Sequence, residues 1–365
     1  MEISKTRDDV ISRLKMTLKH PKATLYYQPQ SVRKLRSEPL DPYRNVFEVD
    51  FNRISDSKAF RRLKHKTQVI WAPSDAHIRT RQQHTVEVIN IATTISRILG
   101  LNEDLTKAIA QGHDIGHPPF GHSGERALKK YIIEKLRDER SFNHHEQTVK
   151  ILQEKAQLEV GPNEFIRGLN LTEQVVDGLK NCSYESNPQT FEARVVCIAD
   201  DIAFVLYDYE ELKELGAVHR NGYVNTMTSL GKTRQEREDN AIKSVIENSN
   251  DDEIKMGKKL ELAIEKVKKY EKEIFVSEDN WARKEKGAKT IINLLMDYLI
   301  NEETETIEKA IKSLTSDEKI SFIETIRSGA DRNETVITYV AYMTDTFALR
   351  LYRHLFSPET INWFF

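Results

Sequence analysis

The chain has 365 residues, of which 31% are charged and 39% hydrophobic, and its 55 basic and 57 acidic side chains give a formal net charge of −2. This length is enough to bury a large core, and the charge balance excludes a general electrostatic attraction to nucleic acid. Two cysteines cannot form a disulfide framework and indicate a reducing compartment. The opening stretch lacks a signal-peptide core and no membrane-length apolar run follows, so we expect a cytoplasmic protein.

The first clear element is a helix that ends at Gly100. In HTVEVINIATTISRILG the apolar residues recur at helical spacing, and glycine is a frequent residue just after a helix. A second helix is predicted after Asn102, a good N-cap followed by two acidic residues. It has to end before the two prolines of HDIGHPPFGH. His113 and Asp114 are therefore expected at its C-terminal end, and IGHPPFGH is expected to form a loop.

Helical patterns continue through the rest of the chain. A helix resumes near Ser123, the polar stretch from about residue 220 to 252 is expected to be a mobile excursion, and helices follow to the C-terminus. No sustained strand alternation is found. We predict an all-α fold, a helical bundle with additional C-terminal helices. The predicted division places a catalytic core with an N-terminal substrate-binding segment in residues 1–215 and a helical region packed on it in residues 216–365.

One helix carries two acidic residues in an otherwise apolar surface. EARVVCIADDIAFVLYDYEEL is apolar almost all round, which is typical of a buried helix, yet Asp200 and Asp201 lie in its middle. A buried carboxylate without a partner is strongly destabilising. A bound metal ion would satisfy it, and ion pairs with arginines are the alternative.

Suitable co-ligands precede this helix in the chain. His84 lies on the first helix, and His113 with Asp114 ends the second. Imidazole and carboxylate ligands without cysteine suit a metal with open water positions better than a closed structural zinc site. They accept Mn, Mg, Fe, Co or Zn, so one divalent ion of undetermined identity is predicted. The order H…HD…D resembles the HD phosphohydrolase superfamily.

Longer blocks narrow the resemblance to one family. In order along the chain these are NRISDSKAFRRLKHKTQV, HIRTRQQHTVEV, HDIGHPPFGHSGE, FNHHEQ, GLNLT, ADDIAF and YVAYMTDTFALRLYRHLFSP. Together they resemble the deoxyguanosine triphosphate triphosphohydrolase family, most densely from about Tyr43 to Asp208. The resemblance implies an HD-domain fold, a metal-dependent site, and hydrolysis of a deoxynucleoside triphosphate (dNTP) to deoxynucleoside and inorganic triphosphate.

The resemblance also assigns metal ligands and a pocket. The ligands are His84, His113, Asp114 and Asp200. Asp200 is preferred to Asp201 because the family has an aromatic residue four positions later and an aspartate eight positions later. These are Phe204 and Asp208, which would share one helix face and line the substrate pocket. The family usually has tyrosine where this chain has Phe204, so one hydrogen-bonding hydroxyl is absent.

The histidine-rich loop is expected to supply the acid–base groups. Its prolines and glycines fold the backbone tightly, so that His117 and His122 can point back toward the ion. By resemblance, His122 and Glu125 form a catalytic dyad in which the carboxylate orients the imidazole. His144 matches a further histidine near the phosphates, although the adjacent His145 leaves this assignment ambiguous.

Four further residues are predicted to contact the substrate. Arg81 lies three residues before His84, nearly on the same helical face, and matches a phosphate contact of the family. Arg53 is a second candidate phosphate clamp near the basic run KAFRRLKHK, which is more typical of a solvated helix face. By resemblance Gln68 contacts the sugar 3′-hydroxyl. Val69 would crowd a 2′-hydroxyl and favour deoxynucleotides.

Partners follow from the same resemblance. The substrate is a dNTP, homo-oligomers are common in the family and often hexameric, and a second dNTP activates some members. Two other functions stay open: another HD phosphohydrolase acting on a different nucleotide, or a nucleotide-sensing or single-stranded nucleic-acid-binding protein. The first alternative does not require KTQV or the extended histidine loop. A silent sensor does not require His122 and Glu125, and weak nucleic-acid binding would show strong salt dependence.

Overall fold

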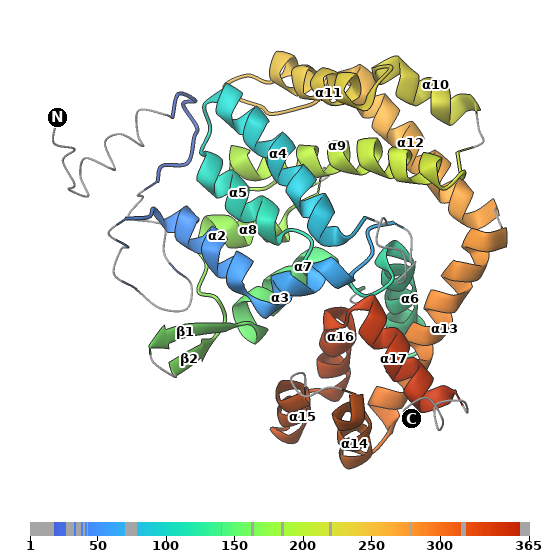
Figure 1. The fold of residues 1–365 in the computed structure, drawn as a ribbon. Helices are drawn as coiled ribbons and strands as arrows, with labels where there is room; N and C mark the ends of the chain where they lie inside the picture. Colours follow the sequence, from blue (N-terminus) through green and yellow to red (C-terminus); the bar gives the residue numbers. More distant parts are fainter. Residues whose placement is uncertain are drawn as a thin grey trace. The chain divides into compact units, whose positions relative to one another are not determined.

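The computed structural model describes residues 18–26, 33, 38, 41, 43–69, 79–139, 141–161, 164–183, 186–218, 221–277, 279–314 and 319–357. Within these ranges sixteen α-helices, α2 to α17, account for most of the chain (Figure 1). The strands found there, β1 (Gln157–Gly161) and β2 (Glu164–Arg167), form one antiparallel hairpin. The all-α prediction is confirmed, with this hairpin as a small addition that the sequence pattern did not indicate. None of the described helices combines the length and apolar character needed to cross a bilayer.

The chain divides into two compact units that interleave along the sequence. The first comprises Met1–Arg61, Gln82–Ile115 and Thr148–Ile274. The second comprises Arg62–Arg81, Gly116–Gln147 and Phe275–Phe365. This division differs from the single boundary expected after residue 215, and that functional boundary stays a prediction.

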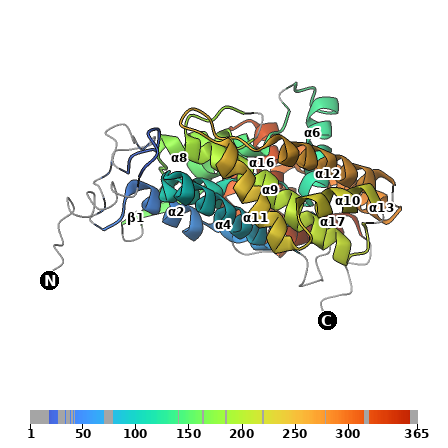
Figure 2. The ribbon, with the colours of Figure 1, turned by 90° about the horizontal axis from the view of Figure 1, so that it is seen from above.

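The first unit is built around helices α5 and α9. In chain order its helices are α2 (Val46–Asp56), α3 (Lys58–Arg61), α4 (Arg81–Leu99), α5 (Glu103–Gly112), the π-helical turn η2 (Ile151–Lys155), α8 (Glu173–Lys180), α9 (Phe191–Glu214), α10 (Asn221–Leu230), α11 (Arg234–Asn248) and α12 (Lys258–Ser277). Helix α5 packs against α2, α8 and α9, and α9 also packs against α11. Both views show α9 and α11 side by side (Figures 1 and 2).

Local signals set the ends of the helices that lead to the candidate site. Gly100 has φ +71°, a conformation that glycine adopts without strain, and it ends α4 as expected. The Asn102 side chain accepts hydrogen bonds from the backbone N–H groups of Asp104 and Leu105, so the predicted N-cap of α5 is confirmed. Helix α5 ends at Gly112, which leaves His113 at its C-cap.

The polar stretch after residue 220 was expected to be an irregular, mobile segment. The structure shows two helices there, so this prediction of its secondary structure is wrong. Helices α10 and α11 bury only a narrow apolar stripe, which includes Tyr223 and Met227 on the first and Ala241 and Val245 on the second. The Thr233 side chain caps the start of α11. A helix with so few apolar positions depends on tertiary packing for its stability. Its amino-acid composition alone therefore does not indicate a helix.

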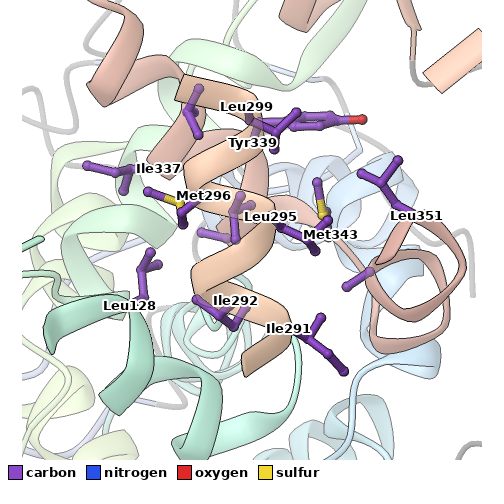
Figure 3. Close-up of a cluster of buried hydrophobic side chains, with 14 of the residues drawn as sticks. Leu128, Ile291, Ile292, Leu295, Met296, Leu299, Ile337, Tyr339, Met343 and Leu351 are labelled. Atoms are coloured by element: carbon purple, nitrogen blue, oxygen red, sulfur yellow. The ribbon is translucent and has the colours of Figure 1, made fainter. Parts of the chain in front are cut away.

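The second unit has its own hydrophobic core around α13. Its elements are the 3₁₀ turn η1 (Arg62–His65), α6 (Gly121–Glu134), α13 (Asp279–Asn301), α14 (Thr304–Leu314), α15 (Lys319–Arg327), α16 (Arg332–Tyr342) and α17 (Asp345–Phe356), while α7 (His144–Lys150) crosses the boundary between units. Leu128 of α6, Leu295 of α13, Ile337 of α16 and Leu351 of α17 meet in this core (Figure 3). The core therefore joins the helix that follows the histidine loop to the C-terminal helices.

The packing of α8 on α5 makes a stability prediction. A Cβ added at Gly178 of α8 would lie 2.5 Å from Cδ1 of Ile109, closer than packed side chains allow. Gly178→Ala is therefore expected to lower the free energy of unfolding by about 1–3 kcal/mol through overpacking. Gly287→Ala on α13 is the matched control, because nothing lies within 4 Å of that added Cβ. It should raise stability by about 0.5–1 kcal/mol. Denaturant unfolding measures both values, and equal effects would contradict the close approach of α8 to α5.

Candidate active site

Three elements of the first unit bring metal-type ligands together. His84 comes from the first turn of α4, His113 from the C-cap of α5, and Asp200 from the middle of α9. Their ligand atoms all lie within 4.8 Å of one another. His84 Nε2 is 2.8 Å and His113 Nε2 is 3.7 Å from the same oxygen, Oδ1 of Asp200. Asp114 adjoins this group, with Oδ1 3.8 Å from His113 Nε2.

The spacing of the ligand atoms and the hydrogen bond of His113 both fit a metal ion. Bonds of about 2.0–2.2 Å place neighbouring ligand atoms roughly 3–3.5 Å apart. His113 Nδ1 lies 2.7 Å from the carbonyl oxygen of Ala110, and donation to that oxygen leaves the lone pair on Nε2. Nε2 is buried and has no hydrogen-bond partner among the described residues. A buried imidazole lone pair facing two carboxylates is the arrangement that a cation would satisfy.

A carboxylate lies near the other ring nitrogen of His84. Its Nδ1 atom lies 3.9 Å from Oε2 of Glu87, which is one helical turn further along α4. A carboxylate that accepts a hydrogen bond from the second ring nitrogen orients a metal-binding histidine, and Glu87 is the nearby residue of that type, although 3.9 Å is longer than a hydrogen bond. The sequence analysis missed Glu87, although its spacing of three residues from His84 was a usable signal.

The two neighbouring aspartates of α9 have different surroundings. The Asp200 side chain is 31% exposed and the Asp201 side chain 15%, so neither is as deeply buried as the sequence suggested. Burial acts to raise the pKa of Asp200, but the His84 hydrogen bond and the charges of His113 and His84 hold it below its ordinary value. Asp201 instead pairs with Lys268 at 2.6 Å, and burial raises its pKa. The predicted ion-pair alternative thus applies to Asp201, with a lysine as the partner.

Glu125 is the centre of a separate histidine cluster in the second unit. His144 Nδ1 lies 3.0 Å from Oε1 of Glu125. His122 Nδ1 is 3.5 Å and His117 Nδ1 3.9 Å from its other oxygen, Oε2. The rings of His117 and His144 stack with centroids 3.7 Å apart. The ring centroid of the neighbouring His145 lies 3.9 Å from that of His144.

The chemistry of this cluster favours proton handling over a second cation. His117, Glu125 and His144 have ligand-type atoms close enough to hold an ion. However, Lys129 Nζ lies 3.2 Å from Oε1 of Glu125 and already supplies positive charge there. Burial acts to raise the pKa of Glu125, but the hydrogen bonds of His122 and His144 and the charge of His117 hold it far below its ordinary value. An ionised carboxylate can orient the His122 ring, whose side chain is 47% exposed.

Two predicted substrate residues lie beside the start of α6. A Cβ added at Gly121 would be 3.1 Å from the carbonyl oxygen of Gln68 and 3.7 Å from Nη2 of Arg81. Gln68 and Arg81 are almost fully buried, at 4% and 1% exposure, and Val69 is half-buried. The structure therefore groups Gln68 and Arg81 with the segment that carries His122.

The other predicted substrate residues have different partners. The Arg53 guanidinium donates to Glu38 at 2.5 Å and to the carbonyl oxygen of Asn170 at 3.0 Å, so its charge is already balanced. Asp208 is fully buried. The pKa of Tyr223 is raised mainly by burial and also by the charges of Glu271 and Asp208. Phe204 lies half-buried one turn before Asp208 on α9. The substrate roles of these residues stay predictions.

Two known protein families match separate ranges of the chain. The HD domain family matches residues 81–204, a range that contains all four proposed metal ligands and the histidine cluster. The phosphohydrolase-associated domain family matches residues 254–354, which include the helices that surround the second core.

Curated relatives extend the similarity over nearly the whole chain. A deoxyguanosinetriphosphate triphosphohydrolase-like protein of Caldanaerobacter subterraneus subsp. tengcongensis is 36% identical over 333 residues, covering 91% of this chain and 90% of the relative. A protein with the same description from Desulfatibacillum aliphaticivorans is 33% identical, covering 88% of this chain and 91% of the relative. One from Clostridium tetani is 30% identical, covering 90% of each. By its similarity to these relatives over most of its length and its match to the HD domain, the chain belongs to the deoxyguanosinetriphosphate triphosphohydrolase-like family of HD-domain hydrolases.

Proposed function

We propose that this protein hydrolyses deoxynucleoside triphosphates to deoxynucleoside and inorganic triphosphate with the help of one divalent ion. The observation that carries the proposal is the pairing of a metal-type ligand group with a separate acid–base group on one short stretch of chain. His113 belongs to the first, with Asp114 adjoining it, and His117, His122 and Glu125 belong to the second. The descriptions of the relatives name the same kind of substrate.

Each group has a distinct task in this proposal. His84, His113, Asp114 and Asp200 would hold the ion. When bound, it would act as a Lewis acid on a phosphate oxygen. Arg81, one helical turn before His84 on α4, would balance phosphate charge. Water attacks the α-phosphorus, the bond from phosphorus to the 5′-oxygen breaks, and His122 supplies the proton that this oxygen needs while Glu125 orients the ring.

The sugar is expected to be selected by Gln68 and Val69. Gln68 is held in place by a hydrogen bond from its backbone N–H to the carbonyl oxygen of Arg79, 3.3 Å away. A ribonucleotide would press its 2′-hydroxyl against an apolar side chain without a hydrogen-bond partner. This costs roughly 1–3 kcal/mol, so dGTP should be hydrolysed about ten- to a hundredfold faster than GTP, compared as kcat/KM. Similar values for the two nucleotides would contradict the assignment.

The proposed function is tested by product analysis. The metal-loaded protein is incubated with each dNTP and each ribonucleotide, alone and in mixtures, and the phosphate product is identified. Tripolyphosphate with deoxynucleoside is expected. Release of pyrophosphate with a nucleoside monophosphate, or of orthophosphate, would assign the protein to a different phosphohydrolase reaction.

The same experiment addresses regulation and assembly. Activation by a second dNTP, which we propose as the effector, would appear as faster hydrolysis in the mixtures than with single nucleotides. Light scattering on the same samples would measure the proposed homo-oligomer, for which a hexamer is the expected size.

A further inference from the structure

A buried carboxylate from the C-terminal helices connects two segments of the second unit. Asp345, the first residue of α17, is 3% exposed. Its Oδ1 atom accepts a hydrogen bond from the backbone N–H of Phe120 at 2.9 Å. Its Oδ2 atom accepts one from the backbone N–H of Thr67 at 3.0 Å. One carboxylate thus binds both the end of the histidine loop and the residue before Gln68.

A buried lysine repeats this connection from the other side. Lys66, which is 1% exposed, donates from Nζ to the carbonyl oxygen of His117 at 2.5 Å and to that of Ala341 at 2.8 Å. Lys66 is the residue before Thr67, and Ala341 lies on α16, just before Asp345. The two side chains therefore tie the same three segments together. Burial raises the pKa of Asp345, while its hydrogen bonds and the charge of Lys66 act to lower it.

The segment Phe120–Gly121 has an unusual backbone conformation and lies close to Gln68. Phe120 has φ +68°, a left-handed conformation that is unfavourable for a residue other than glycine. Gly121 follows at φ +59°, and a Cβ there would lie 3.1 Å from the carbonyl oxygen of Gln68. An unfavourable backbone conformation persists only where the surroundings fix it, and the hydrogen bond to Asp345 is one such constraint.

We propose that Asp345 is a positioning residue that fixes the sugar-selecting segment Thr67–Val69 and the acid–base segment Phe120–His122 in register with each other. This inference rests on the proposed function for the roles of Gln68 and His122. It assigns a task to the C-terminal MTDTFAL motif, which the reaction itself leaves unused. Asp345 acts through the two backbone N–H groups and does not itself contact the substrate.

The effect of loosening this connection follows from its geometry. Asparagine keeps one carbonyl oxygen but turns an NH₂ group toward one of the two N–H donors, so Asp345→Asn loses at least one hydrogen bond. Displacements of about 1 Å in a positioned catalytic group cost on the order of a hundredfold in rate. We expect kcat for dGTP to fall about 10- to 100-fold, and the ratio of dGTP to GTP hydrolysis to fall with it, because both segments shift. Metal content should stay at the wild-type level.

Thr344→Ala is the matched control on the same helix. Thr344 caps α17 through its side chain, which accepts from the backbone N–H of Phe347 at 3.2 Å, and it has no part in the contacts of Asp345. Its loss should lower Tm by a few degrees, as the loss of a helix cap does. Assayed well below Tm, Thr344→Ala should keep the wild-type kcat and nucleotide ratio. If Asp345→Asn changes these two quantities no more than Thr344→Ala does, Asp345 is merely structural and the proposal is overturned.

Hydrogen exchange on the wild-type protein and on Asp345→Asn tests the connection without any substrate. The amides of Thr67 and Phe120 should exchange slowly, and in Asp345→Asn at least one should exchange about tenfold faster or more. Fast exchange of either amide in the wild type would overturn the proposal. Slow exchange in a protein that does not hydrolyse dNTPs would instead show that the connection exists and that the proposed function is wrong.

Discussion

Replacing Asp200 by alanine is expected to abolish metal retention and hydrolysis together. Asp200 is the residue whose Oδ1 atom faces Nε2 of both His84 and His113, at 2.8 and 3.7 Å. Its removal leaves the two imidazoles and Asp114, with one of the two carboxylates gone. Loss of an outer-shell partner alone costs about 10- to 100-fold in metal affinity, so loss of a direct ligand should exceed this range. Elemental analysis after desalting measures occupancy, and product release measures activity.

Asp201→Ala provides the control on the next position of the same helix. Asp201 pairs with Lys268, whose side chain is 47% exposed, so its removal breaks a partly solvated ion pair of modest strength. Metal occupancy and kcat should both remain near wild-type values. Full metal occupancy in Asp200→Ala, or loss of metal in Asp201→Ala, would transfer the ligand assignment to the neighbouring residue.

The sequence was sufficient for the fold class and for the elements around the candidate metal site. Helical periodicity, the Asn102 cap and the Gly100 stop are local signals, and they place His84 and His113 on helices without any knowledge of packing. The polar helices α10 and α11 escaped detection because their stability depends on a few buried contacts with the rest of the unit. The division into two interleaved units could not be predicted from the sequence either, since no local sequence pattern indicates which distant segments pack together.

Sequence reasoning was less complete for the interactions that tune the site. The pairing of His122 with Glu125 was expected only from the family resemblance, and the approach of His144 from α7 to the same carboxylate was not expected at all. Arg53 shows the opposite case. Its charge suggested a phosphate clamp, whereas long-range contacts with Glu38 and Asn170 engage the guanidinium. Whether a charged side chain can bind a substrate depends on its partners from distant parts of the chain, and the sequence alone does not reveal these partners.

Removing the His122 imidazole is expected to separate catalysis from binding. His122 lies outside the metal-type group and its side chain is 47% exposed, so His122→Ala should leave metal content and dNTP affinity nearly unchanged. The proton for the leaving 5′-oxygen would then have to come from water. A positioned acid–base group contributes about 10²–10⁴-fold, and kcat should fall by that factor. A variant that retains most of its activity would exclude His122 as the proton donor.

Glu125 makes a sharper test of the same step, because it should act only through the histidine. Its Oε2 atom lies 3.5 Å from His122 Nδ1, and its pKa is held far below the ordinary value, so it is ionised at neutral pH. Glu125→Gln removes that charge at nearly constant shape and should lower kcat by about 10-fold or more. If the two residues work as one unit, the double variant will lose about as much activity as His122→Ala alone, since a residue without its partner has nothing left to orient. Additive losses in kcat would instead show that Glu125 serves the reaction through His117 or His144, and the proton donor would have to be sought among those rings.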